Sequence, residues 1–524
     1  METLQSNELF AGLLLLLVTI LLLKQLLPAS KASSTKSKSR TTSLPRPRGL
    51  PIIGNLHQLG ALPHNSLAAL SARLGAPLML LRLGSVPALV VSTADALRAV
   101  FQPNDRAMSG RPVQYAAARI TYGMRDIVFS HPDGAFWRSA RRASLSELLG
   151  APRVRGFRGV REGEAAALVD AVADESRAGS PVNLSEKVMA TSNKIVRRVA
   201  FGDDEEGDES IDAGAVLEET QYLLGAFFVV DYIPWLGWID TLRGLRRRLE
   251  KNFRELDAFY ERVIDDHIKK KRGEESKEQD LVDVLLRLHD DPAHGSTFGN
   301  RSHLKGILTD MFIAGTDTAS ATVEWTMTEL LRHPDVLAKA QNEVRSVVVV
   351  AGNGRDDDDG MVREADVPGL TYLKQVIREA MRLHPPVPIL VPRETIEPCT
   401  VYGHAIPAGT RVLVNAKAIG LDPAAWGPDA AAFLPERHEE IDDLSDHKPW
   451  HDSFALVPFG VGRRSCPGVH FATAVVELLL ANLLFCFDWR TPAGGQQVDV
   501  EEEIGLTVHR KNPLVLVAER RAVK

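Results

Sequence analysis

One cysteine, Cys466, lies in a loop whose residue types could bind a metal. Residues 459–468 read FGVGRRSCPG, and an apolar helical run follows at once. Arginines beside a cysteine favour the thiolate, which is a good ligand for a soft or borderline metal. Glycines at this density suit a backbone that approaches a flat group closely. A lone cysteine is nevertheless most often a small buried hydrophobe, so Cys466 alone does not settle the chemistry.

A second group of chemically capable residues, AGTDT at 314–318, interrupts a long helical pattern. The apolar spacing predicts a helix from Leu304 to His333, capped by Ser302 and ended by Pro334. Glycine costs about 1 kcal/mol relative to alanine inside a helix, and Asp and Thr compete with the backbone for hydrogen bonds. The cluster therefore predicts a local opening of the helix. A packing glycine with two surface polar residues is the alternative.

Two pairs of side chains at helical spacing carry charge. Glu379 and Arg382 share a helix face at i,i+3, and Trp137 and Arg141 place an indole and a cation on one face at i,i+4. Pairs of this kind are usually exposed and weak, so their spacing alone would make them ordinary surface features.

Together these motifs resemble those of the cytochrome P450 family. The cysteine loop matches F-x-x-G-x-R-x-C-x-G, the haem-binding loop of that family, in which a Cys thiolate holds the iron. The chain also carries W-x-x-x-R, A-G-x-D-T, E-x-x-R and P-E-R segments, in that order, before the loop. Residues 314–318, 383–386 and 466–468 look most like those of the plant A-type (71-clan) members.

The resemblance implies a haem b cofactor (iron protoporphyrin IX) with Cys466 as the axial ligand of its iron. Bidentate pairing with carboxylates makes arginines the expected partners of the haem propionates. The residues that the resemblance assigns to cofactor binding are Cys466, Trp137, Arg141, Arg393, Arg464, Phe459, Gly462 and Gly468.

Two residues of the long helix receive catalytic roles from the resemblance. Thr318 would hold the oxygen species and its proton-donating water, and Asp317 would help to relay protons. The implied substrate pocket is mostly apolar, which suits an indolic, phenolic, oxime or terpenoid compound. Its expected wall residues are Tyr115, Tyr122, Phe312, Ala314, Gly315, Ile389 and Leu506.

The resemblance also implies a structural brace. Glu379 and Arg382 would be buried, and would join Arg437 of the P-E-R segment in supporting the haem loop. His438 stands where the family has phenylalanine, which puts the local packing in doubt and leaves the charge network in place.

Size and composition favour one large domain. The chain has 524 residues, 44% of them hydrophobic, with no internal repeat and no Pro/Gly/Ser-rich linker after residue 50. A net charge of −6 argues against general nucleic-acid affinity. Three cysteines are too few for a disulfide framework and fit a reducing compartment.

The N-terminal segment predicts a membrane anchor. Residues 9–27 are nearly all apolar, and about 19 helical residues span roughly 28 Å, close to a bilayer core. A cleaved signal peptide is the alternative, but acidic residues precede the run and basic residues follow it. We therefore expect a transmembrane anchor over 1–27, a flexible basic linker and proline hinge over 28–50, and a haem-thiolate monooxygenase domain over 51–524. The expected location is the endoplasmic reticulum membrane, single-pass, with the domain facing the cytoplasm.

The pattern after the hinge predicts a predominantly helical α+β domain, the cytochrome P450 fold, with small β-sheets near its two ends. Apolar runs at 78–83 and 88–92 around a Gly/Pro turn predict a hairpin, and 411–415 and 514–517 predict later strands.

The activity that the resemblance implies is a monooxygenase reaction. One atom of O2 would enter a small, largely apolar molecule, with electrons from NADPH through a partner, NADPH–cytochrome P450 reductase. A basic proximal face would dock this acidic partner, with Arg138, Arg142 and Arg463 as its candidate residues. Two other functions stay open: a haem-thiolate isomerase or dehydratase that does not use O2, and a non-catalytic membrane haem-binding protein. Asp317 and Thr318 weigh against the first because such chemistry needs no proton relay. The lack of His or Met between 312 and 318 weighs against the second.

Overall fold

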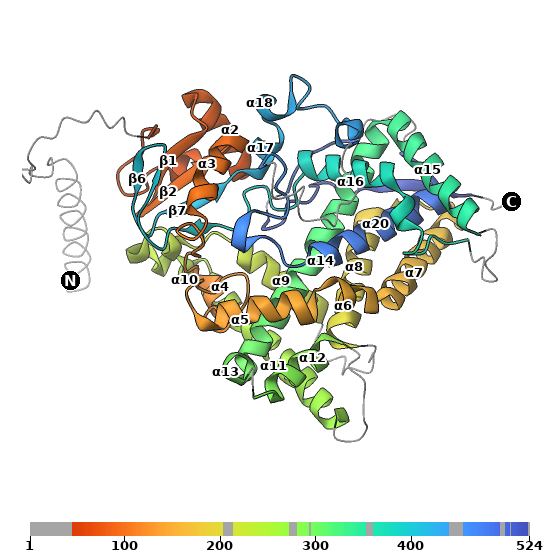
Figure 1. Cartoon of the computed structure of the whole chain (residues 1–524), viewed down its shortest axis with the longest axis horizontal. Helices are drawn as coiled ribbons and strands as arrows, with labels where there is room; N and C mark the ends of the chain where they lie inside the picture. Colours follow the sequence, from red (N-terminus) through yellow and green to blue (C-terminus); the bar gives the residue numbers. More distant parts are fainter. Residues whose placement is uncertain are drawn as a thin grey trace, which may run out of the picture.

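The computed structural model describes residues 44–202, 213–271, 280–292, 295–352, 360–439, 454–492, 498–503 and 505–521. The predicted anchor at 1–27 and most of the linker at 28–50 lie outside these residues. The described chain forms the predicted helix-rich α+β fold, in which helices occupy most of the molecule and short strands gather into small sheets (Figure 1).

Segments from both halves of the chain build a four-stranded sheet. Strands β1 (Leu78–Leu83) and β2 (Val86–Val91) form the predicted antiparallel hairpin, which turns at Gly84 with a φ of 62°. Strand β2 pairs in parallel with β7 (Arg411–Val414), and β7 pairs with the short strand β4 (Arg393–Glu394). The sheet thereby fixes the position of Arg393.

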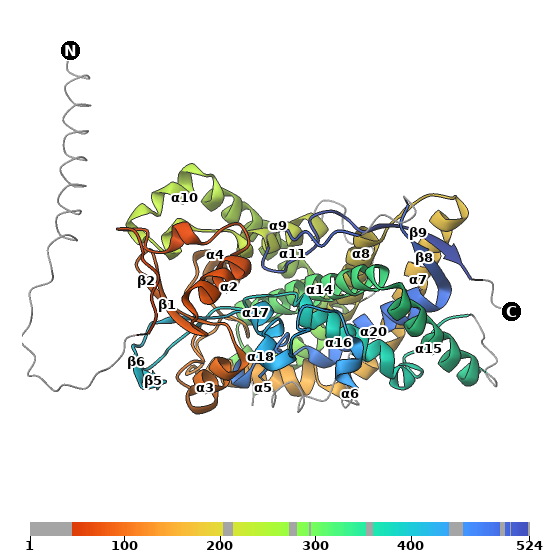
Figure 2. The same ribbon diagram turned by 90° about the horizontal axis from the view of Figure 1, so that it is seen from above.

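A second sheet lies at the opposite end of the molecule (Figure 2). It is antiparallel, in the order β3 (Val182–Asn183), β9 (Val515–Arg520) and β8 (Phe487–Arg490). Strands β5 (Cys399–Val401) and β6 (His404–Ile406) form a separate hairpin. The strand predicted at 514–517 therefore starts one residue later than expected and runs further, to Arg520.

Helices supply the remaining layers. In chain order they are α2 (Pro63–Leu74), α3 (Ala94–Asn104), α4 (Tyr115–Ile120), α5 (Ala135–Ala143), α6 (Ala151–Gly156), α7 (Arg158–Arg177), α8 (Leu184–Phe201), α9 (Ala213–Gly225), α10 (Trp238–Leu242), α11 (Leu245–Lys271), α12 (Leu281–Asp290), α13 (Gly295–Phe298), α14 (Arg301–Arg332), α15 (Pro334–Gly352), α16 (Thr371–Leu383), α17 (Ala416–Gly420), α18 (Pro423–Trp426) and α20 (Val469–Cys486).

Helix α14 is the axis of the core, and it packs against α8, α16 and α20 (Figure 1). Helix α20 directly follows the cysteine loop and is the one helix of the described chain that is long and apolar enough to cross a membrane. Because 83% of that stretch is buried inside the protein, α20 is a core helix.

The long helix predicted from 304 to 333 is α14, but its start differs. It begins at Arg301, and its N-cap is Asn300, whose side chain accepts a hydrogen bond from the amide of Ser302. The predicted cap at Ser302 is therefore wrong. Helix α14 also runs without a break through 314–318, so the expected local opening does not interrupt it.

Gly306 lets α14 approach a neighbouring loop closely. A Cβ at this position would lie 2.1 Å from the carbonyl oxygen of Arg125, a backbone atom that cannot move alone. In helix α7, a Cβ at Gly163 would meet only the end of the Arg198 side chain, at 3.7 Å. The two glycines occupy helix interiors with opposite surroundings.

We predict opposite effects for alanine at these two positions. Gly306→Ala should destabilise the protein by about 1–3 kcal/mol through overpacking. Gly163→Ala should stabilise it by about 0.5–1 kcal/mol, because alanine loses less backbone entropy on folding. Urea denaturation of the two variants measures both values. Equal effects would contradict the close approach at Gly306.

Candidate functional site

A cavity of about 260 Å³ lies between α14, α16 and the cysteine loop. Its wall is mainly apolar, and Thr318 of α14 and Cys466 both line it. Helix α16 contributes Ile377 and Met381. The predicted catalytic threonine and the predicted metal ligand, 148 positions apart in sequence, therefore face one space.

Backbone geometry fixes the cysteine loop. The amide of Cys466 donates to the carbonyl of Phe459 at 2.8 Å, and Gly460 and Gly462 have φ values of 73° and 60°. The positive φ of Gly462 favours glycine there, and a Cβ would also lie 2.1 Å from a carboxylate oxygen of Asp105, so that side chain would have to move. The loop thus presents the cysteine sulfur to the cavity.

Burial raises the pKa of the Cys466 thiol, while the Gly468 amide and the charge of Arg141 lower it. The Gly468 amide lies 3.3 Å from the sulfur atom. The two arginines beside the cysteine in sequence were expected to favour the thiolate, but they point elsewhere. Arg463 is exposed and binds Asp105 at 2.8 Å, so the cation that acts on the sulfur is Arg141 of α5.

Arg464 is turned into the protein. Its guanidinium donates to the carbonyls of Ser109 and Ile127, at 2.8 and 3.1 Å, and to that of Ser130. It stacks 4.2 Å over the ring of Trp137. Arg464 therefore contributes a positive charge to the cavity wall, and Trp137 packs against its guanidinium from outside the wall.

Four guanidinium groups of the described chain line the cavity. They belong to Arg111, Arg141, Arg393 and Arg464. Burial and mutual repulsion lower the pKa of Arg464 to about 9 and that of Arg111 well below its usual value. Burial likewise lowers the pKa of Arg393 to about 10. So many buried cations in one wall call for an anionic ligand.

One nitrogen atom of Arg393 also lacks a counter-charge within hydrogen-bond distance. Its Nη2 donates to the carbonyl of Val461, whereas its buried Nη1 has no hydrogen-bond partner and lies 3.9 Å from Asp105. A planar, dianionic haem requires a thiolate for its iron, guanidinium groups for its propionates and an apolar surface for its ring, and the cavity has residues of all three kinds. The residues of the cavity therefore fit the cofactor that the sequence implies.

Not every predicted cofactor residue reaches the cavity. Arg141, Arg393, Phe459, Arg464, Cys466 and Gly468 line it, whereas Trp137 and Gly462 do not. The indole of Trp137 donates to Ile127 at 3.0 Å, and Gly462 shapes the loop. The sequence reasoning missed Arg111, which stands in no motif and becomes visible only once Val391 and Pro392, which accept its hydrogen bonds, are folded beside it.

The two predicted catalytic residues face different surroundings. The hydroxyl of Thr318 donates to the carbonyl of Ala314 at 2.7 Å and lies at the cavity wall. The carboxylate of Asp317 lies outside the wall and contacts the imidazole of His509 at 2.8 Å. His509 also contacts Glu324 at 3.3 Å. No motif in the sequence points to His509, which lies 192 positions from Asp317.

His509 is a cation bound to two acids. Burial acts to lower its pKa, but hydrogen bonds to Asp317 and Glu324 outweigh burial and raise the pKa of His509 to about 10. The imidazolium holds the Asp317 side chain against the C-terminal segment. Asp317 and Thr318 are adjacent in sequence, but Asp317 bonds to His509 and Thr318 bonds to Ala314.

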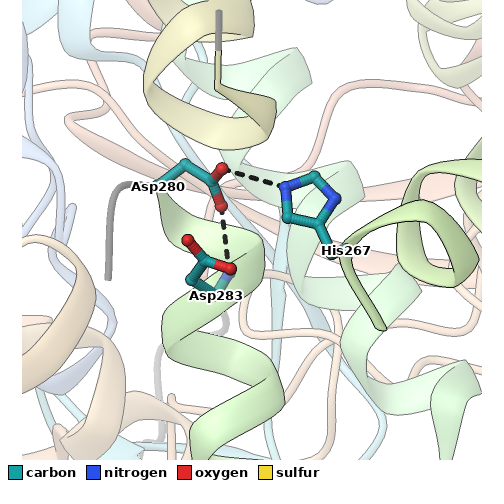
Figure 3. A group of neighbouring side chains, drawn as sticks. All are labelled: His267, Asp280 and Asp283. Atoms are coloured by element: carbon teal, nitrogen blue, oxygen red, sulfur yellow. Dashed lines mark hydrogen bonds and ion pairs between the residues drawn. The ribbon is translucent and has the colours of Figure 1, made fainter. Parts of the chain in front are cut away.

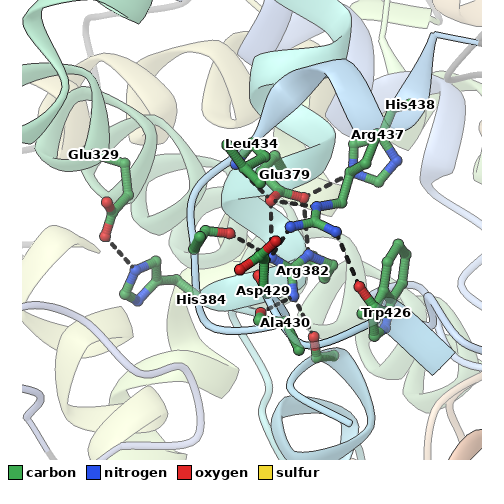
Figure 4. Close-up of polar contacts among 12 residues, drawn as sticks. Glu329, Glu379, Arg382, His384, Trp426, Asp429, Ala430, Leu434, Arg437 and His438 are labelled. Atoms are coloured by element: carbon green, nitrogen blue, oxygen red, sulfur yellow. Dashed lines mark hydrogen bonds and ion pairs between the residues drawn. The ribbon is translucent and has the colours of Figure 1, made fainter. Parts of the chain in front are cut away.

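In the predicted brace Glu379 and Arg382 are buried, Arg437 is half-buried, and all three are hydrogen-bonded (Figure 4). Arg382 donates two 2.8 Å hydrogen bonds to Glu379. Its other donors reach the carbonyls of Gly420, Ala430 and Ala432. The Nε of Arg437 donates to Glu379 at 3.0 Å.

His438 is a further member of this brace. Its Nε2 lies 2.9 Å from Glu379, so the residue that departs from the family pattern binds the same carboxylate (Figure 4). Burial acts to raise the pKa of Glu379, but Arg382 and His438 lower it to about 2. The expectation that His438 affects packing alone was too narrow.

The expected substrate-wall residues divide into two groups. Ala314 and Gly315 line the cavity. Five others are not in its wall and pack elsewhere, among them Phe312 against Phe201 and Tyr122 against Phe253. These five are Tyr115, Tyr122, Phe312, Ile389 and Leu506. Phe312 and Ala314 lie on different faces of α14, and only the face with Ala314 lines the cavity. The motif alone does not show which face points inward.

A cluster elsewhere has metal-ligand residue types. The ligand atoms of His267, Asp280 and Asp283 lie within 4.8 Å of one another (Figure 3). Asp280 accepts from the amide of Asp283 as the N-cap of α12, and it contacts His267 at 2.9 Å. The cluster is therefore explained without a metal: Asp280 caps α12, and its contact with His267 links α12 to α11.

Comparisons with known proteins agree with this site. The family model described as "Cytochrome P450" matches residues 44–517. "Cytochrome P450 71A9" from Glycine max is 48% identical, over 96% of this chain and 97% of the relative. "Strychnine-11-hydroxylase" from Strychnos nux-vomica is 44% identical, over 93% of each chain. A solved structure, "Zebra fish cytochrome P450 another structure with Abiraterone", superposes with a TM-score of 0.68 at 25% identity, covering 88% of this chain and 100% of that one.

We predict that the brace stabilises the fold through bidentate geometry. Arg382→Lys keeps the charge but cannot satisfy Glu379 and three carbonyls, so it should cost about 3 kcal/mol in the free energy of unfolding. Arg177→Lys is the matched control, because Arg177 pairs with Asp174 at the same i,i+3 spacing on the surface. It should cost less than about 0.5 kcal/mol. Similar losses in the two variants, measured by urea denaturation, would refute this role.

Proposed function

The chain belongs to the cytochrome P450 family, and from that premise we propose how its own residues carry out the family's chemistry. It is a haem-dependent monooxygenase that acts on specialised metabolites. The observation that carries the proposal is the shared cavity, in which the Cys466 sulfur and the Thr318 hydroxyl face one space walled by buried arginines.

Each part of the cavity has a separate task. When bound, haem activates O2, and a thiolate ligand favours O–O cleavage. We propose that the Cys466 thiolate holds the iron and that Arg111, Arg141, Arg393 and Arg464 bind the two propionates. The apolar wall orients the substrate and excludes water, which strengthens every electrostatic interaction inside.

Proton supply falls to Thr318 and Asp317 in this proposal. The Thr318 hydroxyl has one proton, donated to Ala314, and its oxygen can still accept from a water in the cavity. Such a water would be held at the wall with a proton pointing into the cavity. Asp317 would take up a proton from the His509 imidazolium, which lies 2.8 Å away, and pass that proton on to the water.

The substrate class follows from the wall. The cavity wall includes apolar side chains from three segments: Ile127, Val128, Met311, Ala314, Val387 and Leu390. They support a compact, largely apolar substrate, of the indolic, phenolic, oxime or terpenoid classes. One relative is, by its name, a hydroxylase of strychnine, and this similarity supports a polycyclic plant metabolite as the substrate of this protein.

We also propose a membrane-facing surface next to the N-terminal hinge. Trp235, Trp238 and Leu242 are 56%, 57% and 76% exposed, which is unusual for three large apolar side chains in one short segment. The backbone of Tyr232 just before them bonds to Ser85 of the β1–β2 turn. Together with an anchor over 1–27, this surface would hold the 51–524 domain at the cytoplasmic side of the endoplasmic reticulum membrane.

The electron donor that we propose is NADPH–cytochrome P450 reductase. Arg138, Arg142 and Arg463 are exposed, and Arg463 belongs to the cysteine loop itself. A basic surface close to the thiolate supports docking of an acidic partner there.

The proposed activity is tested by reconstitution. The purified protein, the reductase, NADPH and 18O2 are incubated with representatives of the four compound classes, and products are analysed by mass spectrometry. We expect one 18O atom in each product molecule. A product with no 18O would favour the isomerase or dehydratase alternative.

We predict that Thr318→Ala uncouples the reaction. The hydroxyl that holds the proton-donating water is lost, so peroxide released per NADPH consumed should rise several-fold. Thr316→Ala is the control, because Thr316 is buried, donates to Phe312 at 3.0 Å and does not line the cavity. Unchanged coupling in Thr318→Ala, or equal uncoupling in both variants, would remove Thr318 from the proton path.

A further inference from the structure

One short loop, residues 126–130, lies between helix α14 and two cavity arginines and is hydrogen-bonded to both. Its carbonyl groups face the arginines: Ile127 accepts from Arg464 at 3.1 Å, and Val128 accepts from Arg111 at 2.8 Å. The carbonyl of Ser130 accepts from Arg464 as well. The geometry of both arginines therefore depends on where this loop is held.

The amide groups of the same loop face two carboxyl groups. The amides of Ile127 and Val128 donate to one oxygen of Asp310, at 2.6 and 3.2 Å. The amide of Phe129 donates to Asp126 at 2.9 Å. The two acids therefore bond to consecutive amides of one loop, and each shifts the pKa of the other. Neither acid has a role in the predicted chemistry, although Asp310 also lines the cavity.

Two neighbouring carboxyl groups in a buried site repel each other when both are ionised, so the second ionisation is unfavourable. Asp126 is 0% and Asp310 is 7% exposed. Burial raises the pKa of Asp126 to about 6, and burial and the neighbouring acid raise the pKa of Asp310 well above its usual value. The charged groups that face the pair are Arg464 and Arg111, and the Tyr260 phenol of α11 lies near Asp310.

We propose that Asp126 and Asp310 share one proton and form a positioning pair for the cofactor-binding arginines. Asp310 is the neutral acid and donates its proton to the Asp126 carboxylate. Its second oxygen and an oxygen of Asp126 order the amides of residues 127–129. The carbonyls of the loop then point at Arg464 and Arg111. The inference rests on the proposed binding of propionates by these two arginines.

Bound propionates would strengthen the effect. They compensate the charges of Arg464 and Arg111, which are the cations that favour the ionised pair. The second ionisation therefore becomes still less favourable in the loaded protein. Deprotonation at high pH would set two carboxylates against each other and loosen the loop.

The sign of the pH dependence follows from linkage. A carboxyl group whose pKa is raised in the folded state binds its proton more tightly there than in the unfolded chain. Stability from the pair is therefore full below the ordinary carboxyl pKa of about 4 and is lost as pH rises through the folded value. Asparagine at 310 keeps the acceptor and the donor without the titration.

The test compares Asp310→Asn with Asp310→Leu in the full chain loaded with haem. Two readouts, the melting temperature and the rate of haem transfer to apomyoglobin, are measured between about pH 5.5 and about pH 8.5. We expect Asp310→Asn to match the wild type at the lower pH and to lose less stability and less haem at the higher pH. Asp310→Leu should lose both at each pH, because the loop amides are left unpaired.

Asp133→Asn is the control, since it removes one carboxylate from an exposed position in the same loop region, and its pH profile should follow the wild type. If Asp310→Leu fails to fold, the comparison of Asp310→Asn with the wild type still decides. An Asp310→Asn variant that is weakened at both pH values, or that keeps the wild-type pH slope, would overturn the shared proton. Neither readout requires turnover, so failure of the pair is distinguishable from failure of the proposed activity.

Discussion

The structure depends on one electrostatic constraint, the convergence of buried guanidinium groups on a single cavity. Arg111, Arg141, Arg393 and Arg464 come from four separate segments, and burial lowers the pKa of each. Such a set is unfavourable without counter-charge, because buried like charges repel and have lost their water. Backbone carbonyls offset part of the cost, most fully at Arg464. The remainder is what a dianionic haem would neutralise, so cofactor binding and stability of this region are linked.

The elements around the cavity can be understood as supports for that arrangement. Helix α16 uses one face for the Glu379–Arg382 brace and another for cavity-lining Ile377 and Met381, so the wall is anchored to a rigid charge network. Helix α14 carries Thr318 in the wall and Asp317 outside it, held by His509. Most polar groups of the site are bonded to backbone carbonyls of the wall or, like Asp317, to a partner outside it, and the space itself stays largely apolar. That combination suits a reaction in which a reactive oxygen must meet an apolar molecule with little water present.

Residues whose neighbours are close in sequence could be predicted from the sequence. The loop around Cys466 is contiguous, and the Glu379–Arg382 pair follows from helical spacing, so the family and the fold were predicted correctly. Arg111 and His509 were missed because their partners lie far away in the chain. Phe312 was assigned to the pocket because a motif gives position but not which helix face turns inward. The role of Arg463 was misjudged for a similar reason, since Asp105 draws it away from the cysteine.

The central claim is that Cys466 supplies a thiolate to the iron of a haem that the arginines hold. The most direct measurement is the difference spectrum of the reduced protein with and without carbon monoxide, recorded for the wild type and for Cys466→His. The wild type should give the red-shifted band of a thiolate-ligated haem, and Cys466→His should lose that band while retaining haem. A wild-type band at the position typical of nitrogen-ligated haem, or an unchanged red-shifted band in Cys466→His, would contradict the claim.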